Sequence, residues 1–206
     1  MCIRDSQINV TKQEDFLWVE DTSEYSLPNW AIDLKAQLDI SDNENLEETN
    51  SVRVKDIACY IFTSGTTGVP KAAICPNQKI LAASVNITIA GYRINETDCM
   101  HNSLPLYHST GLMLGICAVI QAGASTFIKR KFSASSFWDE VQKYNTTALV
   151  YIGELCRYLA NSDPTPAEQN NPLKVMVGNG LRPDVWDIFK DRSVSYTHLR
   201  AHETSR

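Results

Sequence analysis

The pattern of hydrophobic and polar positions changes near residue 57. Residues 7–56 are polar and acidic, and the stretch from Asp39 to Asn50 contains little that could be buried. We therefore expect 7–56 to form an acidic, loop-rich segment exposed to solvent. Scattered apolar residues predict no more than a short strand and a short helix there: Trp18, Leu27, Trp30, Ile32 and Leu34.

From Ile57 onward, short apolar runs alternate with amphipathic segments. The runs predict strands over 59–63, 72–75, 99–104, 124–128, 147–152 and 173–177. Helices are predicted from Asn77, over 111–121, 133–144 and 154–160, and from Pro183, with a surface loop over 162–172 and a tight turn over 178–180. Strands that alternate with helices indicate an α/β fold, a layered domain whose mostly parallel sheet is flanked by helices.

The apolar run over 111–121 raises the alternative of a membrane span. Gly123 interrupts the run before it reaches the ~20 residues that a spanning helix needs. Its small and polar residues also lower its hydrophobicity, so a buried helix followed by a buried strand is the better interpretation.

The two ends of the chain are related to each other through their coding strands. One choice of codons for residues 1–5 (MCIRD) is ATG TGT ATA AGA GAC, and its reverse complement encodes VSYTH, which is the sequence of residues 194–198. The ends resemble a translated transposon end from the preparation of sequencing libraries. We expect 1–6 and 193–206 to be such read-through, and we expect no function for His198 and His202.

The composition excludes several functional classes. The 206-residue chain is 43% hydrophobic, which is enough to build a core. Its net charge of -5 argues against a nucleic-acid partner held by phosphate neutralisation. The six cysteines are scattered without a CxxC pair, so we expect neither a disulfide scaffold nor a zinc site, and we assign no metal ligand.

The residues most informative about chemistry are 63–71, which follow the first buried strand. Four hydroxyl side chains, two glycines and a lysine occur in this stretch: Thr63, Ser64, Gly65, Thr66, Thr67, Gly68 and Lys71. Glycines let backbone amides approach an anion, hydroxyls donate hydrogen bonds, and the lysine supplies a positive charge. The spacing differs from a Walker loop. An ordinary hairpin turn is the alternative, but the order of residues favours a polyphosphate site.

These residues, TSGTTGVPK, resemble the nucleotide-phosphate loop of adenylate-forming (AMP-binding) enzymes. The segment LPLYH at 104–108 is similar to the substrate-side segment of that superfamily. The chain also resembles a narrower branch of the superfamily, the fatty acid transport proteins and very-long-chain acyl-CoA synthetases. The segments that carry this resemblance are KFSAS at 131–135, YIGELCRYL at 151–159 and GNGLR at 178–182. The resemblance covers roughly 57–192 and implies part of the layered α/β N-terminal domain of such an enzyme.

The resemblance implies a two-step ligase reaction. A fatty acid carboxylate attacks the α-phosphate of ATP, which gives an acyl-adenylate and pyrophosphate with Mg²⁺, and the thiol of CoA then displaces AMP. The loop residues Ser64 to Gly68 and Lys71 would hold the β- and γ-phosphates. The Mg²⁺ ligands, the ribose-binding Asp and the catalytic C-terminal domain of the family would lie beyond Arg192, so we expect this polypeptide alone to be inactive.

Two further positions gain roles from the resemblance. His108 would lie near the acyl carboxylate and the α-phosphate, where it would orient and stabilise charge; the alternative is a histidine that caps a loop. Gly178, Asn179 and Gly180 would line the adenine, since two glycines allow a flat backbone surface, although a plain strand-to-helix turn would use the same residues. His101 falls within a predicted strand, and we assign it to structure.

Three interpretations of the parent protein stay open. The first is a long-chain or very-long-chain fatty acid–CoA ligase, possibly coupled to uptake, with fatty acid, ATP and CoA as its partners. The others are an adenylate-forming ligase for another carboxylic acid and an uptake component with a vestigial nucleotide site. The resemblance implies a location in the cytoplasm or on the cytoplasmic face of a membrane, with membrane association through regions absent here.

Overall fold

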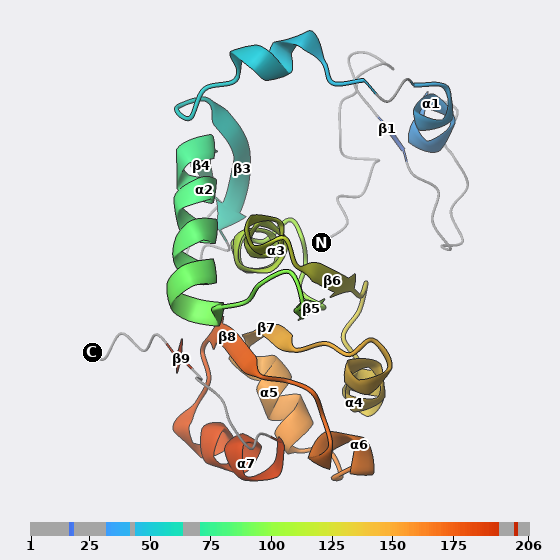
Figure 1. Ribbon diagram of the computed structural model, residues 1–206, viewed down its shortest axis with the longest axis vertical. Coiled ribbons are helices and arrows are strands. Elements are labelled where there is room, and N and C mark those ends of the chain that lie inside the picture. The colour runs from blue at the N-terminus through green and yellow to red at the C-terminus, as the bar shows by residue number, and fades with distance from the viewer. Residues whose placement is uncertain (1–16, 19–31, 42–43, 64–70, 194–199, 202–206) are drawn as a thin grey trace. The chain divides into compact units, whose positions relative to one another are not determined.

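The computed structural model describes residues 17–18, 32–41, 44–63, 71–193 and 200–201 (Figure 1). The chain divides into two compact units, Met1–Val52 and Arg53–Arg206. Each unit is described by itself.

The described residues of the first unit form two short strands and two short helices. Strands β1 (Leu17–Trp18) and β2 (Ile32–Asp33) pair in parallel, and helix α1 (Leu34–Ile40) follows directly. The Asp33 side chain caps α1 by accepting hydrogen bonds from the backbone N–H groups of Lys35 and Ala36. Neither α1 nor the 3-10 helix η3 (Glu47–Ser51) contains a buried residue, in agreement with its polar sequence.

The second unit is built on a parallel sheet of five strands, in the order β6-β5-β7-β8-β9. The strands are β5 (Cys99–Asn102), β6 (Ser125–Ile128), β7 (Ala148–Ile152), β8 (Val175–Asn179) and β9 (Arg200–Ala201). Every adjacent pair of these strands runs in parallel, which confirms the predicted fold class.

Helices connect the strands where the amphipathic segments predict them. They are α2 (Asn77–Asn86) with its π-helical continuation η4 (Ile87–Tyr92), the π-helix η5 (Thr110–Cys117), α3 (Ala118–Ala122), α4 (Ala134–Lys143), α5 (Gly153–Ala160), α6 (Pro166–Gln169) and α7 (Pro183–Ser193). Helix α3 ends at Gly123, whose φ of 66° is left-handed and therefore favours glycine. No helix within the described ranges is long and apolar enough to cross a bilayer.

Helix α6 lies inside the stretch that was predicted to be only a surface loop. The Thr165 hydroxyl accepts a hydrogen bond from the Glu168 backbone N–H, and Pro166 occupies the first turn, so the local sequence starts a helix. Glu168 is then buried against α7, where it accepts hydrogen bonds from Arg192 and Ser193. The loop prediction was wrong because these partners come from a distant segment.

Alternate residues of the central strands pack into two separate cores. Leu149, Tyr151 and Met176 face α4, α5 and α7 in one core. Ala148, Val150, Val175 and Val177 belong to the other, with Met100 and residues of η4 and α3. Because helices cover both faces, the strands carry continuous apolar runs and not an alternating pattern.

Strands β3 (Ile57–Thr63) and β4 (Lys71–Pro76) form a separate antiparallel hairpin, which lies beside α2 in Figure 1. One face of this hairpin is packed, and it includes Ile61 and Cys75 against Met113 of η5. On the other face Tyr60 and Phe62 are 55% and 67% exposed. The first strand was predicted to be fully buried. That prediction was wrong for one face, because the described residues place no element over it.

His101 of β5 is fully buried in an aromatic environment. Its ring lies 4.8 Å from the ring of Phe137 and 5.1 Å from that of Phe127. Its Nε2 atom is 3.7 Å from Glu140 Oε2, and Lys129 contacts the same carboxylate through the other oxygen. Burial disfavours the charged imidazolium and lowers the pKa of His101 from 6.5 to about 4, although Glu140 opposes the shift.

This lowered pKa predicts a loss of stability in acid. Between pH 6.5 and about 4, His101 binds a proton in the unfolded chain but not in the folded chain. The free energy of unfolding therefore falls as the pH drops through this range. At ~1.4 kcal/mol per pH unit, the loss is on the order of 3 kcal/mol. We expect His101→Gln to flatten this part of the pH profile in urea denaturation, whereas exposed His108→Gln should not. An unchanged slope in His101→Gln would contradict the assignment.

Candidate functional site

The carboxyl ends of the parallel strands gather the candidate residues along one edge of the sheet. Strand β7 lies between β5 and β8, so the segments that follow the three strands are neighbours at this edge. His108 lies in the segment after β5, Gly153 begins the segment after β7, and Gly180 follows β8. The structure therefore places His108 and 178–180 on either side of the β7 end.

The strand order also reverses at this edge. The chain passes from β5 to β6 on one side of β5, and then crosses to β7 on the other side. In open α/β sheets, ligands bind outside the carboxyl ends of the strands at such a reversal. The topology therefore predicts a ligand site between the carboxyl ends of β5 and β7.

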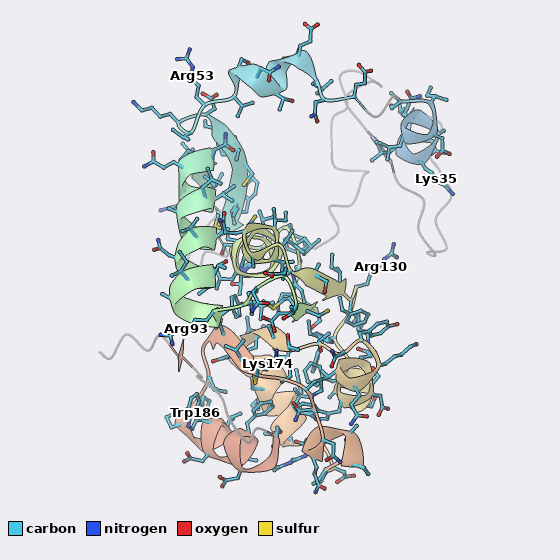
Figure 2. All side chains as sticks on the ribbon, in the orientation of Figure 1. Lys35, Arg53, Arg93, Arg130, Lys174 and Trp186 are labelled. Atoms are coloured by element: carbon cyan, nitrogen blue, oxygen red, sulfur yellow. The ribbon has the colours of Figure 1, made fainter. Side chains whose placement is uncertain are left out.

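The opposite, amino edge is closed by its own hydrogen bonds. Buried Asp98 accepts from the Thr147 hydroxyl at 2.7 Å and from the Asn95 backbone N–H at 3.0 Å. Lys174, labelled in Figure 2, adds a contact of 3.1 Å between its Nζ atom and Asp98 Oδ1. This carboxylate is saturated by protein donors, so it is built for stability and not for a ligand.

His108 presents one ring nitrogen outward. Its Nδ1 atom accepts a hydrogen bond from the Thr110 backbone N–H at 3.2 Å, at the start of η5. Its own backbone N–H donates to the Pro105 carbonyl at 3.1 Å. Because Nδ1 is an acceptor, the neutral ring carries its hydrogen on Nε2. The His108 side chain is exposed. Its Nδ1 atom caps the loop, as the alternative interpretation predicted, and its Nε2–H is on the opposite side of the ring from that hydrogen bond.

A buried amide holds the segment that carries His108. Asn102, at the end of β5, donates to the Gly111 carbonyl at 3.0 Å and accepts from the Leu104 backbone N–H at 3.1 Å. A Cβ atom at Gly115 would lie 2.3 Å from Asn102 Nδ2, and one at Gly111 would lie 2.4 Å from the Pro105 carbonyl oxygen. Sequence reasoning missed Asn102; the spacing of these two glycines, one helical turn apart, was the available signal.

The segment 178–180 differs from the predicted tight turn. Strand β8 continues through Asn179, because Gly178 pairs with Tyr151 and Asn179 pairs with Ile152 of β7. Only Gly180 leaves the strand, with a left-handed φ of 72°. The turn prediction was wrong because the pairing with β7 extends the strand beyond its apolar residues.

Glycines at the ends of β7 and β8 allow an unusually close backbone approach. A Cβ atom at Gly178 would lie 2.1 Å from the Tyr151 carbonyl oxygen, and one at Gly153 would lie 1.7 Å from the Gly180 carbonyl oxygen. Neither neighbour is a flexible side chain, so no other residue fits without moving the backbone. The two strand ends are thus in direct backbone contact: Gly178 is buried against Tyr151, and Asn179 and Gly180 beside it are exposed.

The candidate phosphate loop is a hairpin connection. Thr63 ends β3 and pairs with Lys71, which begins β4 and is exposed. Ser64, Gly65, Thr66, Thr67 and Gly68 lie outside the described residues, as do Val69 and Pro70. The structure thus brings the two ends of the loop together at the end of a hairpin.

Comparison with known proteins identifies the family. The AMP-binding enzyme family matches residues 4–199, and the chain belongs to it. Medium/long-chain-fatty-acid–CoA ligase FadD6 of Mycobacterium tuberculosis is 44% identical over 148 residues, which are 72% of this chain and 25% of the relative. Human long-chain fatty acid transport protein 6 is 41% identical over 169 residues, which are 81% of this chain and 27% of the relative. The chain spans about a quarter of these relatives.

Solved structures share the fold. ATP-bound MatB from Rhodopseudomonas palustris superposes with a TM-score of 0.64 at 21% identity, covering 74% of this chain and 30% of that one. The inhibitor-bound N-terminal domain of FACL13 from Mycobacterium tuberculosis gives a TM-score of 0.68 at 16% identity, covering 84% and 42%. The layered α/β fold of adenylate-forming enzymes is thereby confirmed.

The glycine contacts predict a sharp difference between two alanine substitutions. Gly153→Ala forces the backbone at Gly180 to move, so we expect a loss of about 3 kcal/mol or a failure to fold. Gly91→Ala is the matched control, because its Cβ would meet only the movable end of the Ile87 side chain. Urea denaturation of both variants measures the difference. Equal stability of the two would show that the close approach is wrong.

Proposed function

We propose that this chain is part of a fatty acid–CoA ligase that activates medium- to long-chain fatty acids with ATP and transfers the acyl group to CoA. Membership of the AMP-binding family supports the adenylation chemistry. The names of relatives that are 41–44% identical support a fatty acid as the substrate. Because the chain spans about a quarter of their length, the activity belongs to the full-length parent protein.

The chemistry requires a nucleotide because a carboxylate is a poor acyl donor. Attack of the thiol of CoA on a free carboxylate would have to expel oxide. Attack of the carboxylate on the α-phosphate of ATP instead expels pyrophosphate and leaves an acyl-adenylate. The CoA thiolate then attacks the acyl carbon and expels AMP, which is a good leaving group. The work of the protein is to position these groups and to neutralise phosphate charge.

One observation carries the proposal. The His108 segment follows β5 and the segment Gly178–Gly180 ends β8, so both lie at the same carboxyl edge, on either side of β7 and near the reversal of strand order. A nucleotide that spans these segments would place its base and its α-phosphate on different strands of a rigid sheet. Strand ends hold such groups more firmly than an isolated loop does.

At this edge we assign His108 to the reacting groups. The hydrogen on Nε2 would be donated to an oxygen of the fatty acid carboxylate or of the α-phosphate, while the Thr110 N–H fixes the ring through Nδ1. This role is orientation and charge stabilisation. A general base is unnecessary, since a carboxylic acid is already ionised at neutral pH.

The adenine is assigned to Gly178, Asn179 and Gly180. Gly178 is buried, so the exposed part of this segment is Asn179 and Gly180. A base would stack on the peptide plane at Gly180, and the Asn179 amide offers both a donor and an acceptor. The β- and γ-phosphates are assigned to Ser64, Gly65, Thr66, Thr67, Gly68 and Lys71, with Thr63 at the base of the loop.

We assign the binding of Mg²⁺ and CoA to the remainder of the parent protein. Over the ranges that the structure describes, no three His, Cys, Asp or Glu side chains form a group that could hold a metal ion. We therefore assign no Mg²⁺ ligand to this chain. When bound, the ion would neutralise the charge of the departing pyrophosphate.

A second function is favoured by the name of a relative, long-chain fatty acid transport protein 6. Ligation to CoA would trap a fatty acid that has crossed a membrane, so the same reaction supports uptake. We place the parent protein at the cytoplasmic face of a membrane on this ground. Uptake that persists when adenylation is abolished would favour a vestigial nucleotide site instead.

Substitution of Lys71 tests the phosphate assignment. In the full-length parent protein, we expect Lys71→Ala to reduce fatty-acid-dependent ATP–pyrophosphate exchange by about 10- to 100-fold, because a charged hydrogen bond contributes ~1.5–3 kcal/mol. Thermal stability should change little. Lys79→Ala, at an exposed lysine in the first turn of α2, is the control. Exchange at the wild-type rate in Lys71→Ala would refute the assignment.

The two nitrogens of His108 can be tested separately. In His108→Asn the amide oxygen can still accept from the Thr110 N–H, but the donor at the Nε2 position is lost. If His108 contacts the reacting groups, His108→Asn and His108→Ala should both lower kcat of adenylation by about tenfold or more. If the ring is only a loop cap, His108→Asn should retain wild-type kcat in single-turnover kinetics.

A further inference from the structure

Three cysteine side chains gather on the packed face of the β3–β4 hairpin and the helix beneath it. Cys75 is 2% exposed and packs with Ile61 and Met113. Cys59 packs against the same cluster and is half-buried, and both are free thiols. Burial raises the pKa of the Cys117 thiol, at the end of η5, and the nearby Cys59 thiol raises it further.

Within this group, Cys59 and Cys75 have the geometry of a cross-strand pair. They are direct register partners in the antiparallel hairpin. Opposed residues in such a ladder have Cα atoms about 4.5–5.5 Å apart and side chains on the same face. Disulfides form at Cα separations of about 4.4–6.8 Å. Burial raises the pKa of the Cys59 thiol, and the adjacent Cys75 thiol raises it further, which agrees with direct contact.

We propose that Cys59 and Cys75 are a redox pair that closes a cross-strand disulfide when the protein meets a peroxide. In the first step the Cys59 thiolate attacks one oxygen of hydrogen peroxide, the O–O bond breaks, and hydroxide leaves as water after protonation. Cys59 is then a sulfenic acid. The Cys75 sulfur attacks the Cys59 sulfur and expels a second water. Two thiols lose two protons and two electrons, and one peroxide is reduced to two waters.

Cys59 is the first thiol to react because it is the more accessible of the two. Cys75 is buried on the packed face of the hairpin, so a peroxide reaches its thiol less easily. Cys75 can still attack a sulfenic acid at Cys59, because the two residues are already opposed in the ladder. The raised pKa of Cys59 makes its thiolate scarce at neutral pH, so the reaction should accelerate as the pH rises.

The bond would fix the base of the candidate phosphate loop. Cys59 lies shortly before Thr63, and Cys75 lies shortly after Lys71, so the disulfide would tie together the two strands that lead into residues 64–70. Oxidation should therefore restrict adjustment of this loop around a nucleotide. This consequence rests on the proposed function, whereas formation of the bond does not.

Peptide mapping tests the bond directly. The folded 206-residue chain is treated with hydrogen peroxide at pH 8.5, remaining thiols are alkylated, and the chain is cut with trypsin. Cleavage after Lys55, Lys71 and Lys79 puts Cys59 and Cys75 on separate peptides. We expect a linked pair, 56–71 joined to 72–79, in about tenfold excess over any other pair, because among the cysteines that the structure describes Cys59 and Cys75 are the ones opposed in a strand ladder.

Matched variants make the result decisive. Cys99→Ser removes a half-buried thiol from another strand and should leave the linked pair intact, whereas Cys59→Ser should abolish it. Independent alkylation of Cys59 and Cys75 after oxidation, or a dominant link from Cys59 to the peptide that contains Cys117, would overturn the proposal.

A second measurement separates the bond from its consequence. In the full-length parent protein, peroxide should cause a loss of ATP–pyrophosphate exchange that a thiol reductant restores and that is absent from Cys59→Ser. If the linked peptide forms but exchange is unaffected, the effect on the loop is wrong while the redox pair stands. If wild-type exchange is absent even before oxidation, the proposed function fails and the mapping result is unaffected.

Discussion

The contact between the backbones of β7 and β8 at their carboxyl ends is the constraint on which the site depends. A carbonyl oxygen of one strand occupies the space where the other would carry a Cβ atom, at both Gly178 and Gly153. Only glycine satisfies this geometry without strain. The same contact that holds the two strand ends together also fixes where the exposed Asn179 and Gly180 lie, so the stability of the sheet and the position of the proposed adenine site have one origin.

The buried amide of Asn102 holds the segment that follows β5, the second strand of the site. Asn102 ties the segment after β5 to the start of η5, and Gly115 leaves the room that the amide needs. His108 is held by that segment through its backbone and through Nδ1, which leaves Nε2 as the donor. Protein donors hold the Asp98 carboxylate, so the amino edge of the sheet stabilises the fold. The carboxyl edge carries the exposed side chains of His108 and Asn179.

Much of the fold could be predicted because its signals are local. Apolar runs gave the parallel strands, and Pro76 and Gly123 marked helix ends. What failed depended in part on partners distant in sequence. Thr165 and Pro166 start the helix at 166–169 locally, but the burial of Glu168 in it is accompanied by a hydrogen bond from Arg192, and the strand continues through Asn179 because β7 pairs with it. The role of His108 came from a motif, since composition and spacing alone also permit a loop cap. Asn102 was missed because its signal, the spacing of Gly111 and Gly115, lies in a different segment from the amide itself.

The central claim is that the carboxyl edge holds the nucleotide. Photolabelling of the full-length parent protein with 8-azido-ATP tests it most directly, because the azide lies on the adenine. Trypsin cuts after Lys174 and next after Lys190, because Pro183 prevents cleavage after Arg182. The peptide 175–190, which contains Gly178 to Gly180, is thereby isolated. The account predicts a label in this peptide that excess ATP prevents. A label that ATP prevents but that lies only in peptides away from the carboxyl edge would contradict it.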